Sequence, residues 1–475
     1  MSDKVLRIGV TAGVNPTAAA VMKAELLGVA ARAGVRIEVL STDEELRQDA
    51  TDKKTMEADR RIAALRQTWA LQAMGCDEVI VPDVRIDPVR RELQAELEVP
   101  VVPLYDGLAA LGPRRIGVLG YAVSADFVLS RAAEGSAVVP TSEPVMEAFR
   151  QLQNAETGLR RQGMTDEHRE RFIAAARALV AAGADLLVPA CTQMARFANV
   201  LKEEGLPVLD ILADTALRAV TKPLARLGKP FKVGLIGGLG PAATVDLYDK
   251  IVKATPAKTD QEHIKLVVEQ NPQTPDRTAC LLGQGDDPTF ALYGMAMKLE
   301  ADGCDAVIVP CNTAHAFMPF VERHLSIPCI NMQKAALEEI QAKLGKDARI
   351  GLLATRGTVQ SRIYAEKAEA MGLPMFVPDE ERQDRVMAAI YGPEGAKAGF
   401  TDGVCREDLM SGVEYLVRTY DSNCLILGCT ELPLILDESD AFPVAGKSVM
   451  MIDPTAALAR KVVKIALEKN KAAGR

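Results

Sequence analysis

Short, continuously apolar runs alternate along this chain with longer stretches of helical periodicity. In the second half the runs are VGLIGG, KLVVEQ, AVIVP, RIGLLA and CLILG, which begin at residues 233, 265, 306, 349 and 424. Runs of this length that are rich in β-branched residues and apolar on both faces are typical of buried parallel strands. The longer stretches predict helices that cover the two faces of the sheet. The pattern therefore predicts an α/β fold with parallel sheets.

The two halves of the chain repeat this pattern in the same order. CDEVIVPDVRID matches CDAVIVPCNTAH, RRIGVLG matches ARIGLLA, and GADLLVPACTQM matches SNCLILGCTELP. The openings RIGVTAGVNPTAA and KVGLIGGLGPAAT also correspond. The matching segments lie roughly 230 residues apart, which indicates duplication of a domain in tandem. We expect one domain over 1–228 and a second over 229–475, joined by the connector KPLARLGKP at 222–230.

Each half also contains a smaller echo of itself. VIVPCNT and LILGCTE both read as a strand followed by Cys and Thr. We therefore expect each domain to consist of two pseudo-symmetric α/β lobes, each with its own parallel sheet.

Composition and charge narrow the classes of protein to which the chain can belong. Of its 475 residues, 48% are hydrophobic and 25% are charged, which is typical of a globular protein with a sizeable core. The net charge is −8, and the basic residues are scattered singly among acidic ones. This distribution argues against nucleic acid and against an anionic membrane surface as partners.

Nothing in the pattern predicts a secreted or membrane protein. The opening MSDKVLRIGV runs directly into a predicted strand, without the long apolar region of a signal peptide. The most apolar long stretch, 172–190, is interrupted by Arg177 and Asp185. We expect a cytoplasmic location, in which the nine cysteines remain thiols. With four histidines and no CxxC or HExxH motif, we predict no metal site.

Two cysteines stand where ligands of open α/β sheets bind. Cys311 follows the run DAVIVP and Cys429 follows CLILG, so both are expected beyond the carboxyl ends of strands. A helix is predicted from Thr313 through His324, and another after Cys429. The N-H groups of a helix N-terminus favour thiolate over thiol. A single buried cysteine is more often a packing residue, but two in the same context predict a functional pair.

Two thiols have a specific use in the inversion of an α-carbon. One base removes the α-proton from one face while a second acid delivers a proton to the other face. Thiols suit both roles because their pKa values lie within reach of neutral pH. Without a cofactor, the negative charge of the carbanion passes into the α-carboxylate. The N-H groups near Asn312, Thr313 and Thr430 are expected to stabilise that charge.

Eight motifs extend this argument to a family. GGLGPAAT, TDQEHIK, NPQTPDRT, VPCNTAHAF, GLLATRGT, GAKAGF, GCTELP and MIDPT occur in this order over 231–467. This half resembles the aspartate racemase family of the aspartate/glutamate racemase superfamily. The resemblance implies a substrate held between two lobes, a catalytic thiol from each lobe, no pyridoxal phosphate or other cofactor, and a homodimer in many members.

The resemblance also implies the residues of the site. The two catalytic thiols match Cys311 in PCNTAH and Cys429 in GCTE, and the residues that hold the carboxylates of the substrate match Arg277 in PDR and Lys397 in KAG. These roles agree with residue chemistry, because Arg binds a carboxylate with two parallel hydrogen bonds and a second cation would hold the other carboxylate. The alternative is that Arg277 and Lys397 are ordinary surface charges.

The substrate is expected to be aspartate rather than glutamate. Glutamate racemases of the superfamily carry His after the second Cys-Thr pair, where this chain has Glu431, and they open with Asp-Ser, where it has GGLGP. A glutamate racemase or one of broader specificity remains an alternative, as does a regulator that binds amino acids without turning them over. For His315 and His324, a packed or surface imidazole is the expected role.

One motif points to a different class of enzyme. GLGPAA after a predicted strand satisfies the dinucleotide-binding pattern, and Glu269 ends the next strand. The proline after the second glycine and the later motifs fit a nicotinamide dehydrogenase poorly. We expect instead that this loop closes over the substrate, with Gly240 in contact with it.

The first half keeps the scaffold but changes the chemistry. Asp83 stands at the position of Cys311, Cys191 remains, and Arg161 falls opposite Lys397 when the two Thr-Asp pairs are aligned. An ionised Asp cannot donate the second proton. We expect a non-catalytic copy that packs on the active half as an internal pseudo-dimer. Its own chemistry, or the binding of an effector amino acid, is the alternative.

Overall fold

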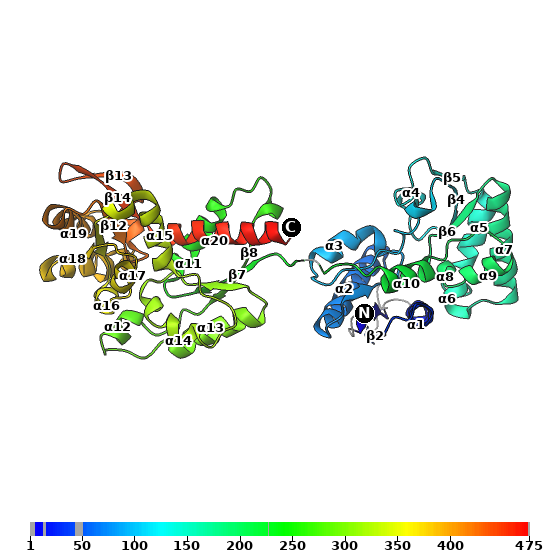
Figure 1. The fold of residues 1–475 in the computed structure, drawn as a ribbon, viewed down its shortest axis with the longest axis horizontal. Coiled ribbons are helices and arrows are strands. Elements are labelled where there is room, and N and C mark those ends of the chain that lie inside the picture. The colour runs from blue at the N-terminus through cyan, green and yellow to red at the C-terminus, as the bar shows by residue number, and fades with distance from the viewer. Residues whose placement is uncertain (1–4, 13–15, 43–50, 227, 474–475) are drawn as a thin grey trace. The chain divides into compact units, whose positions relative to one another are not determined.

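The computed structural model describes residues 5–12, 16–42, 51–226 and 228–473. Contacts divide the chain into two units, Met1–Lys229 and Pro230–Arg475, which are described separately below. Residues 13–15 of the first opening motif and residue 227 of the expected connector lie outside the described residues. Figure 1 shows helices packed around strands in each unit.

The first unit contains two parallel sheets. Its strands are β1 (Leu6–Thr11), β2 (Ile37–Thr42), β3 (Glu78–Ile80), β4 (Arg115–Leu119), β5 (Ala137–Val138) and β6 (Leu186–Pro189). Its α-helices are α1 (Pro16–Ala33), α2 (Lys53–Ala73), α3 (Arg90–Ala95), α4 (Ala125–Leu129), α5 (Glu143–Leu152), α6 (Leu159–Gln162), α7 (Asp166–Ala181), α8 (Thr192–Ala195), α9 (Ala198–Glu203) and α10 (Ile211–Thr221), with 3-10 turns η1 (Asp87–Val89) and η2 (Ala109–Leu111). The strand orders are β2-β1-β3 and β5-β4-β6.

The second unit repeats this arrangement with a larger second sheet. Its strands are β7 (Lys232–Gly237), β8 (Lys265–Gln270), β9 (Ala306–Ile308), β10 (Ile350–Leu353), β11 (Met375–Phe376), β12 (Cys424–Leu427), β13 (Ser439–Val444) and β14 (Lys447–Ile452). Its helices are α11 (Pro241–Ala254), α12 (Arg277–Leu281), α13 (Thr289–Ala301), α14 (Met318–Glu322), α15 (Met332–Leu344), α16 (Arg356–Gln360), α17 (Ala365–Ala370), α18 (Glu380–Tyr391), α19 (Val404–Tyr420) and α20 (Pro454–Ala472). The 3-10 turns are η3 (Asp260–Glu262), η4 (Thr313–Ala316), η5 (Gly345–Asp347), η6 (Ala396–Ala398) and η7 (Leu432–Leu434).

The predicted α/β class with two lobes per domain is confirmed. The sheet β8-β7-β9 is parallel throughout, and each of the five apolar runs forms a strand. The sheet β11-β10-β12-β14-β13 is parallel except at its edge, where β13 and β14 form an antiparallel hairpin that the apolar pattern does not predict. Because the faces of a buried strand are covered by helices, residues that contact a ligand are expected at the ends of the strands.

The two faces of β7 explain its continuous hydrophobicity. On one face, Val233 and Leu235 pack in a cluster with side chains of α11 and α20. On the other face, Ile236 packs with Leu292 and Met295 of α13. Figure 1 shows α11 and α20 on one side of β7 and α13 on the other. Burial on both sides stabilises the sheet and places the carboxyl end of β7 beside those of β8 and β9.

The helix expected from Thr313 through His324 is interrupted. The structure has η4 over Thr313–Ala316 and a short α14 over Met318–Glu322. Pro319 stands in the first turn of α14, where it donates no amide hydrogen bond and its ring restricts the preceding residue. The helix therefore restarts after η4. Within the described part of the chain, no helix is long and apolar enough to cross a membrane.

Candidate active site

A cavity between the two lobes of the second unit gathers most of the predicted site. It encloses about 320 Å³ of empty space, part of it open to solvent. Its lining includes seven of the predicted residues, Arg277, Cys311, Asn312, Thr313, Lys397, Cys429 and Thr430, together with Leu239, Asp276, Thr278, Thr355, Tyr391, Gly428 and Glu431. The cavity lies beyond the carboxyl ends of strands from both sheets, because parallel strands of one sheet end at the same edge.

Cys311 lies beside a buried cation. The thiol is 8% exposed, and Arg277 is the first residue of α12, whose N-cap is Asp276. Arg277 donates hydrogen bonds to the carbonyl oxygens of Leu239 (2.5 Å) and Pro275 (3.1 Å). Burial by itself would lower the pKa of Arg277, but the charge and hydrogen bonding of the Cys311 sulfur more than offset it, so that the pKa is raised. Arg277 is thus placed to stabilise negative charge on this sulfur.

Cys429 has an anion rather than a cation as its nearest charged neighbour. Its thiol donates to Oε2 of Glu431 at 2.9 Å, and Thr430 donates to the same oxygen at 3.1 Å. Nζ of Lys397 lies 3.2 Å from Oε1 of Glu431 and 5.0 Å from the ring centroid of Tyr391. Burial raises the pKa of the Cys429 thiol well above its usual value, and the charge of Glu431 raises it further. Cys429 is therefore held as a neutral thiol.

The expectation that a helix N-terminus favours the thiolate at both cysteines is wrong for Cys429. The elements that follow Cys311 and Cys429 are the four-residue η4 and the three-residue η7, not full helices. Turns this short align few peptide dipoles, and Pro433 in η7 has no N-H to contribute. The charges of Arg277 and Glu431 distinguish the two thiols instead.

Glu431 remains ionised although its side chain is only 12% exposed. Burial alone would raise the pKa of its carboxyl, but the Lys397 ammonium and the hydrogen bonds from Cys429, Lys397 and Thr430 lower it. The carboxylate therefore links one predicted cation to one predicted thiol. Lys397, on η6, keeps its charge for the same reason, since Glu431 offsets the effect of burial and raises its pKa.

Hydrogen bonds from Tyr364 and Gln333 fix the orientation of Asn312 in the cavity wall. Its Oδ1 accepts a 2.6 Å hydrogen bond from the Tyr364 hydroxyl, and its backbone carbonyl accepts one from Gln333 at 3.1 Å. Its Nδ2 is buried and has no hydrogen-bond partner among the residues that the structure describes. A buried donor without a partner is costly. The amide nitrogen is thus available to an acceptor on a bound molecule.

Four threonine hydroxyls join the two lobes beside this amide. Thr313 lies 2.9 Å from Thr358 and 3.4 Å from Thr355, between hydroxyl oxygens. Thr278 of α12 donates to Thr355 at 3.4 Å. Because Thr278 and Thr313 come from one lobe and Thr355 and Thr358 from the other, the network fixes the width of the cavity.

Gly240 lies against Glu431 rather than in the cavity wall. Its φ is 147°, a conformation that L side chains rarely adopt. A Cβ added there would lie 3.2 Å from Oε1 of Glu431. Glycine therefore leaves room for the pair of Lys397 and Glu431, and contact between Gly240 and a substrate stays a prediction.

The two histidines near Cys311 behave as expected of packed and surface residues. Nδ1 of His315 lies 2.9 Å from the carbonyl oxygen of Cys311, and Nε2 accepts from the Met332 amide at 3.2 Å. Burial lowers the pKa of His315 to about 4, so the ring is neutral. His324 is exposed and packs edge-on against Tyr293. His315 thus holds the loop that carries Cys311.

Several residues of the site were not predicted. In the sequence, Glu431 only distinguishes the chain from glutamate racemases, whereas in the structure it contacts both Cys429 and Lys397. Tyr391 ends α18 and Tyr364 precedes α17, and no motif connects either residue with the cavity. For Glu431, its position directly after Cys429 and Thr430 is the feature of the sequence that could have indicated a place in the site.

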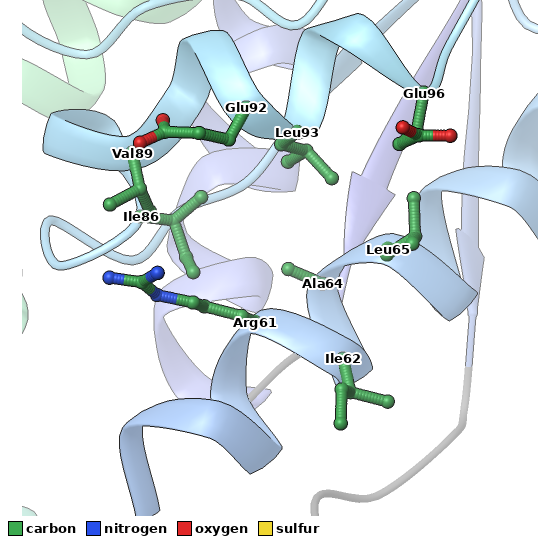
Figure 2. Close-up of a pocket in the computed structure, with 9 residues that line it drawn as sticks. All are labelled: Arg61, Ile62, Ala64, Leu65, Ile86, Val89, Glu92, Leu93 and Glu96. Carbon is green, nitrogen blue, oxygen red and sulfur yellow. The ribbon is translucent and has the colours of Figure 1, made fainter. Parts of the chain in front are cut away.

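A second hollow lies on the first unit and has a different character. It lies between α2 and α3, and Figure 2 shows its lining. The lining is mainly apolar and consists of Ile62, Ala64, Leu65, Ile86, Val89 and Leu93 with the charged residues Arg61, Glu92 and Glu96. Among its described lining residues, Glu92 and Glu96 are the two groups that could act as acid or base, and no thiol or histidine accompanies them.

Known proteins resemble the chain in both halves. The profile described as Asp/Glu/Hydantoin racemase matches residues 12–219 and again residues 236–462. The broad specificity amino-acid racemase RacX of Bacillus subtilis is 26% identical over 240 residues, which is 49% of this chain and 96% of RacX. A glutamate racemase of Shewanella sp. (strain MR-4) is 30% identical over 161 residues, 33% of this chain and 54% of that protein. The solved structure of Picrophilus torridus aspartate racemase covers 50% of this chain and 94% of its own, at 28% identity and a TM-score of 0.40.

Proposed function

The chain belongs to the Asp/Glu/hydantoin racemase family, and from this premise we propose that its second unit interconverts L- and D-aspartate with Cys311 and Cys429 as the two acid-base groups. The observation that carries the proposal is the unequal charge around two thiols that line one cavity. Arg277 lies beside Cys311, while the Cys429 thiol donates to the Glu431 carboxylate. A two-base racemase needs one thiolate and one thiol at the same time.

The reaction follows from this inequality. The Cys311 thiolate takes the α-proton, and the electron pair of the broken C-H bond moves into the α-carboxylate. The Cys429 thiol delivers its proton to the opposite face of the α-carbon. The enzyme then holds a Cys311 thiol and a Cys429 thiolate, which is the state that starts the reverse reaction. No cofactor takes part in these steps.

The polar groups of the cavity suit a dicarboxylic amino acid. The free Nδ2 of Asn312 is placed to donate to the α-carboxylate as its charge grows, which is where a fixed donor lowers a barrier most. Thr313 and Thr430 line the same cavity. Lys397 supplies a cation for the side-chain carboxylate, and Arg277, largely occupied by backbone carbonyls, contributes its charge at the Cys311 end.

The experiment is incubation of the pure protein with L-aspartate in D2O without pyridoxal phosphate. We expect loss of the α-proton signal in the NMR spectrum together with formation of D-aspartate. Cys311→Ala and Cys429→Ala should each abolish both. Full activity in the Cys429→Ala protein would overturn the two-thiol mechanism, and absence of deuterium at the α-carbon in the unaltered protein would overturn the activity itself.

A racemase of broader specificity is the second candidate. It is favoured by the likeness to RacX, whose name describes broad specificity and of which this chain covers 96%. The same D2O experiment with glutamate and with neutral amino acids separates the two candidates. Labelling of aspartate alone supports the first, and comparable labelling of neutral amino acids supports the second.

A further inference from the structure

The first unit has a cleft at the place that corresponds to the site of the second unit. It encloses about 340 Å³ of empty space, against about 320 Å³ in the second unit, in both cases including space open to solvent. Its lining consists of Arg60, Asp83, Arg85, Ala122, Arg160, Thr192 and Gln193. Asp83 follows β3 as Cys311 follows β9, and Thr192 follows β6 as Thr430 follows β12.

Arg60 is the most unusual of these residues because it is buried without full pairing. Arg60, on α2, is 7% exposed. Its Nε lies 3.1 Å from Oδ2 of Asp83, and its Nη1 has no hydrogen-bond partner among the described residues. Burial lowers the pKa of Arg60, and the charges of Arg85 and Arg160 lower it further, against the opposing effect of Asp83. The guanidinium groups of Arg85 and Arg160 therefore both repel that of Arg60.

Asp83 cannot relieve this repulsion alone. Its Oδ1 accepts from the Arg85 amide at 3.1 Å and from the Thr192 hydroxyl at 3.4 Å, while Oδ2 faces Arg60. Among the lining residues that the structure describes, three arginines stand against this one carboxylate, an excess of two positive charges. The buried Arg60 faces Asp83, whereas the exposed Arg85 and Arg160 face no further carboxylate among the described lining residues, which suits the cleft to a dianion.

Two matching positions make the cleft of the first unit more positive than the site of the second unit. Arg85 stands where the second unit has Thr313, and Gln193 where it has Glu431. Alignment through the Thr-Asp pair puts Arg161 opposite Lys397, but the neighbouring Arg160 is the residue that lines the cleft. The two substitutions at Arg85 and Gln193 add a positive charge and remove a negative one.

We propose that this cleft of the first unit binds a small dicarboxylate. The arginine fork matches the two oxygens of a carboxylate, and three arginines provide for two such groups. The empty space is close to that of a site we assign to aspartate. Among the lining residues that the structure describes, Asp83 is the one carboxylate and it already faces Arg60, so these residues offer no partner for an ammonium group.

The test is isothermal titration of the full chain with succinate, which carries two carboxylates and no amino group. Arg85→Gln and Arg160→Gln should each weaken binding about tenfold, because each removes a charged hydrogen-bond donor. Arg85 and Arg160 are exposed, so neither substitution disturbs the core. The matched control is Arg161→Gln, which replaces the neighbouring exposed arginine outside the cleft and should bind succinate as the unaltered chain does.

Two further arms make the result decisive. In a Cys311→Ala, Cys429→Ala chain, the effect of Arg160→Gln should persist, which separates this site from racemisation. Inorganic phosphate should compete poorly with succinate. Equal succinate binding by the unaltered chain, Arg85→Gln and Arg160→Gln would overturn the proposal. Phosphate binding that is sensitive to Arg160→Gln, without such sensitivity for succinate, would overturn the assignment to a dicarboxylate.

Discussion

Cys191 and Cys429 occupy matching positions in the two units, and each donates its thiol hydrogen to the side chain two residues later. The acceptor is Oε1 of Gln193 at 2.8 Å in the first unit and Oε2 of Glu431 at 2.9 Å in the second. Burial raises the pKa of Cys191 to about 11, and burial together with the Glu431 charge raises that of Cys429. The fold thus preserves the direction of the thiol, while the charge of the acceptor differs.

The other half of each cleft differs more deeply. Cys311 in the second unit lies beside Arg277, whereas Asp83 in the first lies 3.1 Å from Arg60. A cation is retained at this point, but the group that it contacts has changed from a thiol to a carboxylate. A carboxylate is a weaker base toward a C-H group than a thiolate is. The comparison teaches that a shared scaffold can separate binding from proton transfer.

The largest expected effect comes from placing the residue of the first unit in the second. Cys311→Asp should lower the rate of aspartate racemisation by at least about 1000-fold, because the strong base and its conjugate acid are both lost. The measurement is the rate of D-aspartate formation and of deuterium uptake at the α-carbon. Cys191→Ala is the control and should leave both rates nearly unchanged. A Cys311→Asp chain with a tenth of the original rate would break the comparison.

A smaller effect is expected from exchanging the acceptor. Glu431→Gln keeps a hydrogen-bond acceptor for Cys429, as in the first unit, but removes its charge. The rate should fall about tenfold, because Lys397 loses its ion pair while the thiol stays oriented. The raised pKa of Cys429 should move toward its ordinary value, since one of the two main causes is gone.

The pH dependence of kcat/KM shows in which direction the pKa of Cys429 moves in Glu431→Gln. In the direction that uses Cys429 as the base, kcat/KM rises as the thiol ionises, so the rise should occur at lower pH in Glu431→Gln than in the unaltered chain. Glu407→Gln, at an exposed position on α19, is the matched control and should leave the profile in place. A rise that stays in place or moves to higher pH in Glu431→Gln would show that Glu431 does not govern Cys429.

The strands and the meeting of the two thiols could be predicted for a simple geometric reason. The run VGLIGG forms β7 over Lys232–Gly237 because a segment apolar on both faces is stable only inside a layered sheet. Residues that follow parallel strands then meet at one edge, which brings Cys311 to the cavity. Periodicity and strand ends are local features, and the sequence displays them directly.

Contacts that depend on distant segments could not be predicted in this way. Tyr391 reaches the cavity because α18 packs on α19, and no local pattern encodes that packing. The hairpin of β13 and β14 is also hidden, because β13 is largely exposed and contains Pro443, while its turn places Ala445 at a φ of 51°. The sequence shows that Glu431 is charged, but it does not show that Glu431 pairs with Lys397, which is expected to hold a carboxylate of the substrate.

The last difference between the two units lies at the amino ends of β3 and β9, away from both clefts, and we expect it to leave catalysis unchanged. Glu78 of β3 is fully buried, and the matching residue of β9 is Ala306. Oε2 of Glu78 accepts from the Leu224 amide at 3.1 Å, and Oε1 has no hydrogen-bond partner among the described residues. Burial raises the pKa of Glu78 from 4.5 to about 7.

This raised pKa makes the stability of the first unit depend on pH. Below pH 4.5 the carboxyl is protonated in both folded and unfolded chains, and it contributes nothing to the pH dependence. Between pH 4.5 and 7 the unfolded chain loses the proton first, so the free energy of unfolding falls, by about 3 kcal/mol in all.

Glu78→Gln keeps the acceptor for Leu224 and cannot ionise, so it should unfold at higher temperature than the unaltered chain at pH 8 and at about the same temperature at pH 4. Trp69, the one tryptophan of the chain, lies on α2 and reports the melting of this unit by its fluorescence. Glu134→Gln, at an exposed position, is the control. Equal melting temperatures of Glu78→Gln and the unaltered chain at pH 8 would show that ionisation of Glu78 does not destabilise the first unit.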